Sequence, residues 1–167
     1  MRLGPNTCSN ILEIKGNKDD IIKFFKGLYG HTSIYNRYNK KQYIENKEKE
    51  FNKKKYPTFN TYAKISETIE LYGYNCFGDK YYLEKWGTKL DTLIYYSKEI
   101  EDEINKIIKY QHEICVSKIQ FDTFRTPPIK WIEACSNLNP KIFFTLEYID
   151  YKNNKGCKKI KKGNFFT

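Results

Sequence analysis

The chain has few of the residues from which metal and nucleophile sites are built. Its histidines are His31 and His112 alone, and its five cysteines are spread along the sequence without a C-x-x-C pair. A structural zinc site needs four Cys or His ligands, so His112 and Cys115, three residues apart, do not make one. The sequence therefore predicts no metal site, and free thiols in a reducing compartment.

Motifs that cradle phosphate or activate a serine are also missing. The sequence has no G-x-x-x-x-G-K-[ST], no G-x-G-x-x-G after a predicted strand and no G-x-S-x-G. Cys8 could be a thiol nucleophile beside a histidine, but a small buried hydrophobe near the first strand is favoured. Asp91 and Asp122 could form an acid–base or cation-binding pair, but structural hydrogen bonds and ion pairs are favoured. We therefore expect no enzymatic activity and no cofactor.

Long apolar runs are absent as well. No stretch approaches the ~20 apolar residues of a membrane-spanning helix, and none follows Met1 and Arg2 as in a signal peptide. These absences predict a cytoplasmic protein without a membrane partner. The length of 167 residues fits one domain, or one domain with a sizeable insertion.

Lysine and aromatic residues are abundant. The net charge is +10, and there are fifteen Tyr and eleven Phe. The charge is concentrated, because residues 31–64 carry a net +6 and residues 152–162 carry another +6 without an acidic residue. This pattern indicates either a polyanionic partner, nucleic acid or an acidic protein face, or solvated lysines that keep an aromatic-rich protein soluble.

Hydrophobic periodicity predicts strands and helices in an order typical of a ferredoxin-like fold. Such a fold is α+β, with an antiparallel sheet of four strands and its two main helices on one face. Alternation over 80–96 favours a strand, a turn and another strand, and the spacing over 98–110 favours an additional helix. The remaining predicted strands are 9–15, 114–124 and 141–149, and the main helices are 17–29 and 127–137.

Two segments fall outside this order. Residues 30–80 are rich in lysine and tyrosine, and we expect them to form an insertion or excursion on the surface of a single domain, 1–167. Residues 151–167 follow the last predicted strand, and their lysines predict a basic tail.

Several stretches of the chain resemble one known family. NTCSNILEIKG (6–16) is similar to the N-W-C-S-N-x-L-x-V-x-G opening of the YubB-like ferredoxin-like domains, and EKWGTKLD (84–91) to their N-W-G-T-K-W-D. FDTFRTPP (121–128) and the strand FFTLEYID (143–150) follow in the family's order. The resemblance implies a ferredoxin-like fold and the plasmid or phage setting of this Api-like family, and it implies no activity. Family-motif residues here are Trp86, Gly87, Thr88, Lys89, Asp122, Pro127 and Pro128, whereas Thr7, Leu90 and Arg125 replace tryptophans of the family.

Tryptophan beside glycine in EKWGTKLD has two interpretations. The favoured one is a structural corner, in which the indole of Trp86 packs on the sheet and Gly87 allows a close approach. In the other, Thr88 and Lys89 contact a phosphate group.

The sequence thus favours a mobile-element accessory protein that acts by binding nucleic acid or a nucleoprotein complex. Aromatic residues among charges can stack on bases or anchor a protein interface, and this combination marks the lysine/tyrosine-rich segment as the main contact and the basic tail as an auxiliary one. An alternative is an inhibitor of a host defence system, such as a CRISPR effector, that binds a host protein directly. The predicted contact residues are Tyr35, Arg37, Tyr38, Lys40, Lys41, Tyr43, Lys53, Lys54, Lys55, Tyr56, Lys158, Lys159, Lys161 and Lys162.

Overall fold

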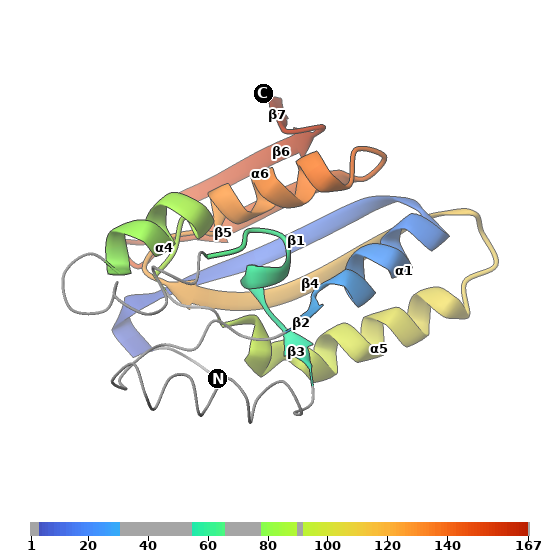
Figure 1. The fold of residues 1–167 in the computed structure, drawn as a ribbon, viewed down its shortest axis with the longest axis horizontal. Coiled ribbons are helices and arrows are strands. Elements are labelled where there is room, and N and C mark those ends of the chain that lie inside the picture. Colours follow the sequence, from blue (N-terminus) through green and yellow to red (C-terminus); the bar gives the residue numbers. More distant parts are fainter. Residues whose placement is uncertain (1–3, 31–54, 66–77, 90–91, 167) are drawn as a thin grey trace.

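An antiparallel sheet of five strands forms one layer of the molecule, and the helices cover one face of it (Figure 1). The computed structural model describes residues 4–30, 55–65, 78–89 and 92–166, and these make an α+β fold. The strand order in the sheet is β4-β1-β5-β6-β7. The strands are β1 (Thr7–Asn17), β4 (Ile114–Phe124), β5 (Phe143–Ile149), β6 (Lys155–Lys161) and β7 (Asn164–Phe166), and the helices are α1 (Lys18–Gly27), α4 (Gly78–Trp86), α5 (Ser97–Ile108) and α6 (Ile129–Leu138).

Shorter elements connect these. Two-residue strands β2 (Tyr29–Gly30) and β3 (Tyr56–Pro57) pair with each other in a separate small sheet. The 3-10 helices are η1 (Gly4–Asn6), η2 (Phe59–Thr61) and η3 (Leu93–Tyr96). No helix among the described residues combines the length and the apolar character needed to cross a membrane.

Strand β1 organises the sheet, because both of its edges are paired. Its whole length pairs with β4, and Ser9 to Lys15 pair with β5, in both cases antiparallel. Helix α6 connects β4 to β5, so these two parallel strands flank β1. Alternation along β1 buries Cys8, Asn10, Leu12 and Ile14 under the helices and turns the residues between them to the outer face of the sheet.

The predicted helices 17–29, 98–110 and 127–137 are confirmed as α1, α5 and α6. At the start of α1 the Asn17 side chain accepts a hydrogen bond from the backbone N–H of Asp19 (2.9 Å), as a helix cap does. Helix α1 then buries Ile21, Phe24 and Phe25.

The predicted strands within 80–96 are wrong. Residues 78–86 form helix α4, and residues 93–96 form the 3-10 helix η3. Tyr82 and Trp86, four residues apart, share one face of α4, where their ring centroids are 4.8 Å apart and both side chains are buried. Tyr, Trp, Thr and Ile favour strands in general, and here the packing of this pair overrides that preference.

The expected basic tail is instead part of the sheet. Strand β6 pairs with β5 over six positions, and Ile160 lies opposite Phe144 with both side chains fully buried. Tyr148 lies over Gly156, where a Cβ atom would meet its ring. Ile160 is the sole branched apolar residue of β6, and lysines occupy most of the other positions. The sequence therefore shows no apolar alternation that would have predicted a strand here.

Aromatic rings fill the core between the helices and the sheet. Phe59 of η2 lies 4.6 Å from Trp131 and 5.7 Å from Trp86, measured between ring centroids. Phe59 and Ile65 are fully buried, so this part of the expected surface excursion contributes side chains to the core, although Lys55, Tyr56 and Lys64 stay exposed. The rest of the expected insertion, 31–54 and 66–77, lies outside the described residues.

Candidate nucleic-acid interface

The structure describes six of the predicted contact residues. Lys55 and Tyr56 precede and begin β3, and both are exposed. Lys158, Lys159 and Lys161 lie in β6, and Lys162 is in the turn that follows. The others lie outside the described residues, namely Tyr35, Arg37, Tyr38, Lys40, Lys41, Tyr43, Lys53 and Lys54.

A tight turn fixes where the β6 lysines point. Lys162 and Gly163 join β6 to β7 with φ angles of 52° and 74°, the positive values at both central positions that a type I′ hairpin requires. The turn is tied to helix α6, because the Gly163 N–H donates to the Ser136 hydroxyl (3.1 Å). The register of the hairpin turns Lys159 and Lys161 to the outer face, away from the helices.

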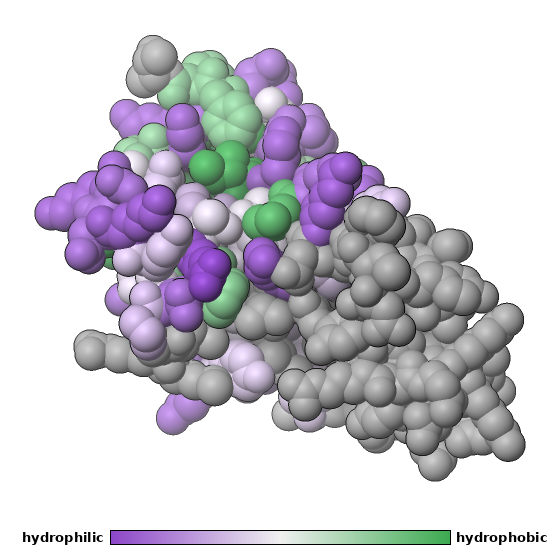
Figure 2. All heavy atoms as spheres, turned by 90° about the vertical axis from the view of Figure 1, so that its left-hand side faces the viewer, coloured by the Kyte–Doolittle hydropathy of each residue, from purple (hydrophilic) through white to green (hydrophobic). Residues whose placement is uncertain are grey.

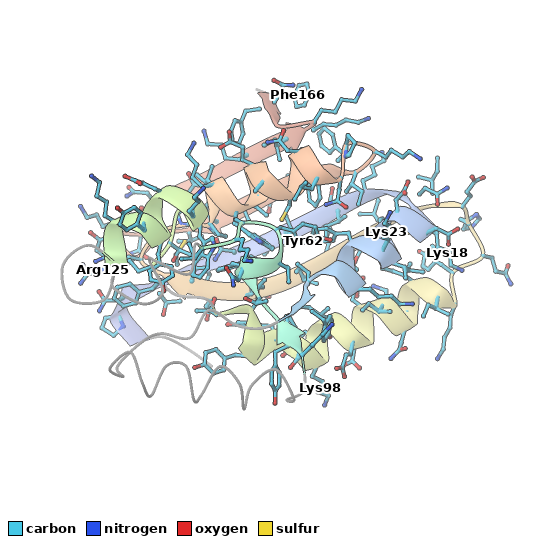
Figure 3. The ribbon with its side chains drawn as sticks, in the orientation of Figure 1. Lys18, Lys23, Tyr62, Lys98, Arg125 and Phe166 are labelled. Carbon is cyan, nitrogen blue, oxygen red and sulfur yellow. The ribbon has the colours of Figure 1, made fainter. Side chains whose placement is uncertain are left out.

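Two phenylalanines share this outer face with the lysines. Phe166 of β7 lies opposite Lys159, and its ring centroid is 6.1 Å from that of Phe143 on β5. The Phe166 side chain is 50% exposed, whereas Phe143 is half-buried. Figure 3 places Phe166 at the far edge of the sheet, beyond β6. Strands β5 and β7 therefore present an aromatic pair beside the lysines of β6.

Lysines from three parts of the chain meet beside this pair. Lys15 of β1, Lys141 before β5 and Lys161 of β6 line a groove of about 600 Å³ together with Phe143. Lys15 lies opposite Phe143 in the β1–β5 register, so a Lys–Phe–Lys row crosses the neighbouring strands β1, β5 and β6. Glu113 on the rim accepts a hydrogen bond from the Asn17 amide (3.1 Å). We call Lys15, Lys141, Phe143 and Lys161 the lysine groove.

The other end of the outer face has mixed charge. A second hollow, of about 550 Å³, is lined by Ile11, Ile149 and Cys157, with Glu147 and Lys155 among its polar neighbours. Figure 2 shows the side of the molecule that lies on the left in Figure 1. Among its coloured residues, polar side chains predominate and apolar ones form small separate patches. This end carries less cationic character than the lysine groove.

Lys118, between the two ends, is already paired with an acidic residue. Its ammonium group lies 2.9 Å from the Glu13 carboxylate across the β1–β4 pair. This hydrogen-bonded ion pair raises the pKa of Lys118. The central part of the outer face is therefore locally neutralised.

Arg125 forms a separate basic-aromatic cluster. It has a φ angle of 63°, and its guanidinium lies 5.2 Å from the Phe124 ring centroid and 5.6 Å from that of Tyr151. Its Nε donates to the Asn6 side chain (3.1 Å). Figure 3 shows Arg125 at the opposite end of the molecule from Lys18 and Lys23.

The structural corner at Trp86 and Gly87 is confirmed. The fully buried Trp86 indole donates to the carbonyl of Ala63 (2.7 Å). Gly87 has a φ angle of 81°, and a Cβ atom there would lie 3.0 Å from both the Ile129 nitrogen and the Pro127 oxygen. The corner thus packs against the Pro127-Pro128 start of α6, and only glycine fits it without strain.

Hydroxyl groups cover the outer edge of β4. Thr88 donates to the carbonyl of Phe124 (3.1 Å), and Thr92 donates to the carbonyl of Asp122. The Asp122 N–H donates to the Tyr96 hydroxyl (2.9 Å). These side chains take the places of strand-ladder partners, and the sequence offered no signal for this role. Thr88 is buried by this contact, which leaves its hydroxyl poorly placed to meet a phosphate.

Two of the residues considered for catalysis, Cys8 and Asp122, have structural partners. Asp122 accepts a hydrogen bond from the Ser9 hydroxyl (3.0 Å), while Asp91 lies outside the described residues. Cys8 is fully buried, and burial raises the pKa of its thiol to about 11, which disfavours the nucleophilic thiolate. His112 lies near the far end of the β1–β4 pair, roughly 30 Å along the strand from Cys8.

No metal-binding cluster of three or more His, Cys, Asp or Glu side chains occurs within the parts of the chain that the structure describes. No protein-family model, no curated protein and no solved structure matches the chain. The resemblance of its motifs to the YubB-like domains therefore remains a proposal.

Proposed function

We propose that this protein acts by binding, without catalysis, and that its partner is nucleic acid or a nucleoprotein complex. The observation that carries the proposal is the β6–β7 hairpin with the lysine groove beside it. Residues 151–166 hold six lysines and no acidic residue, and the sheet fixes several of these lysines next to Phe143 and Phe166. Lysines attract phosphates, and aromatic rings give bases a stacking surface.

The positive charge of the β6 lysines is available to a partner. Within the described residues, ion pairs involve Lys80, Lys106, Lys118 and Lys130, and none involves a lysine of β6. Their positive charge is therefore not offset by a bound carboxylate. A concentrated cationic surface of this kind favours a polyanion.

The proposal includes a ferredoxin-like arrangement and a mobile-element setting. One β-α-β unit split around β1 supports the arrangement. The order of the family-like motifs supports the plasmid or phage setting. In such a setting, the accessory protein engages nucleic acid, and the composition of the lysine/tyrosine-rich segment keeps it in the proposal as the main contact, with the hairpin lysines as an auxiliary one.

The second candidate is an inhibitor that binds a host defence protein directly. Arg125, stacked on Phe124 and Tyr151, favours it, because Arg and Tyr are common anchors of protein interfaces. The two candidates use opposite ends of the molecule, so variants can separate them.

A binding titration with matched variants tests the proposal. The test variant reverses Lys158, Lys159, Lys161 and Lys162 to Glu, and the control reverses Lys26, Lys85, Lys98 and Lys109, which are exposed on or beside the helices. We expect a labelled oligonucleotide to lose affinity for the test variant only. The slope of log K against log salt should also become shallower, because fewer counterions are released.

Equal losses in both variants would show that any lysine suffices, and unchanged binding by the test variant would exclude the hairpin. Capture of one host protein in a fixed ratio from nuclease-treated lysate, lost in Arg125→Ala, would favour the inhibitor instead. A folded, nucleic-acid-free complex of that kind would overturn the first candidate.

A further inference from the structure

We infer that the nucleic acid bound at the lysine groove is single-stranded, and that an unpaired base stacks on Phe166 beside Phe143. This inference rests on the proposed function and specifies its substrate class. Phe166 provides the first step. It lies on a three-residue edge strand, outside the hydrophobic core, and half of its side chain is accessible. Burial in the fold does not account for this ring.

The surroundings of the ring provide the second step. Phe166 contacts Phe143 with an angle of 31° between the ring planes, which makes a nearly continuous aromatic surface. Lys159 lies opposite Phe166 in the β6–β7 pair, and Lys161 lines the groove with Phe143. Neighbouring strands are about 4.8 Å apart, so cations stand on both sides of the aromatic pair at distances that long side chains span.

The shape and charge of the outer face provide the third step. In a duplex, bases are stacked internally, so an exposed ring at a sheet edge gains little from it. A rigid duplex laid across the face would also pass over the neutralised Glu13–Lys118 pair and over Glu147, whereas a flexible strand can stay at the cationic end. The groove of about 600 Å³ lies in the size range of small-ligand sites, which suits a few unpaired nucleotides.

The central strands define how far the stacking surface extends. On the outer face, β1 presents Ser9, Ile11, Glu13 and Lys15, and none of these is aromatic. Sheets that bind single-stranded RNA through their centre place aromatic residues there. The aromatic pair beside the lysine groove lies at the β5–β7 edge, away from the Phe124 and Tyr151 cluster, so we expect a short footprint.

Fluorescence anisotropy with two probes tests the inference. One probe is a labelled single strand of about 12 nucleotides, within the site sizes known for single-strand-binding folds, and the other is the same strand annealed to its complement. We expect the single strand to bind at least about 5-fold more tightly at equal salt. Phe166→Leu should weaken single-strand binding by about 5-fold or more, and Phe166→Trp should retain it.

Phe165→Leu is the matched control, because Phe165 is the neighbouring residue and is similarly exposed, on the opposite side of β7. It should bind the single strand like the unaltered protein. If Phe166→Leu lowers the thermal midpoint, the double variant Lys15→Glu/Lys161→Glu tests the same site independently. That variant should lose more single-strand affinity than the control variant Lys26→Glu/Lys98→Glu, in which two exposed lysines outside the groove are reversed.

The outcomes separate this inference from the proposed function. Equal affinity for single strand and duplex, or full single-strand binding by Phe166→Leu, would overturn the inference and leave a general polyanion site standing. Failure of both probes to bind would overturn both. Binding of a host protein alone would likewise exclude the inference.

Discussion

Replacing Gly87 by alanine should destabilise the fold strongly, although the change adds only one methyl group. Its φ angle of 81° lies in the left-handed region, where a non-glycine residue costs about 1–2 kcal/mol. The new Cβ would lie 3.0 Å from the backbone of Pro127 and Ile129, and forcing a methyl group into such a packed site costs typically about 1–3 kcal/mol.

A smaller effect opposes these costs. Alanine reduces the entropy of the unfolded chain, which stabilises the folded protein by about 0.4–1 kcal/mol. The balance is a loss of about 2–4 kcal/mol in the free energy of unfolding. In a chain of this size, such a loss lowers the thermal midpoint by roughly 5–15 °C.

Urea unfolding followed by tryptophan fluorescence measures this loss. The chain has two tryptophans, Trp86 and Trp131, and both are fully buried, so the signal reports on the core next to the corner. Gly16→Ala is the control, because its Cβ would meet ordinary contacts at 3.7 Å. A loss below about 1 kcal/mol in Gly87→Ala, or a similar loss in Gly16→Ala, would refute the idea that this corner requires glycine.

Two further predictions concern titrating groups. At about pH 8, the exposed Cys157 should react quickly with a thiol reagent, whereas Cys8, whose pKa is raised to about 11, should react only as the protein unfolds. Labelling rates measured in Cys→Ser variants test this expectation. Fast labelling of Cys8 in the folded protein would contradict it. Asp150 accepts hydrogen bonds from Asn154 and Lys152, and these hydrogen bonds lower the pKa of its carboxyl group. The ionised carboxylate therefore stabilises the β5–β6 turn at pH values above the ordinary pKa of Asp. This stabilisation is lost as the pH falls through the lowered pKa. The urea midpoints of the unaltered protein and Asp150→Asn should therefore differ at neutral pH and converge in acid; a constant difference would contradict the assignment.

The sequence was most informative where a single element carried its own pattern. Leu12 and Ile14 alternate in β1, and Ile21, Phe24 and Phe25 repeat at helical spacing in α1, so both elements were predictable from local periodicity. Residues 80–96 were misassigned because their aromatic and β-branched residues favour strands, while the deciding contact of Trp86 is with the distant Ala63.

The candidate site could be predicted only in part. Lysine density alone pointed to Lys159 and Lys161. Lys15 and Phe166 joined them only through the strand order β1-β5-β6-β7, which no local spacing encodes. The lysine/tyrosine-rich residues of the main predicted contact, Arg37 among them, stay a prediction, because they lie outside the described residues.

The hydroxyl groups along β4 bear on how the length of this chain can evolve. A strand in that position would have to keep its register, because one inserted residue moves every side chain to the other face. The contacts with β4 are instead made by the side-chain hydroxyl groups of Thr88, Thr92 and Tyr96. The chain that precedes these residues therefore does not have to keep a strand register. Each doubling of the length of a connection costs only about 0.6 kcal/mol, so related proteins should vary in length ahead of Thr88, outside the packed residues 55–65 and 78–86, while the three hydroxyl-bearing positions keep their spacing.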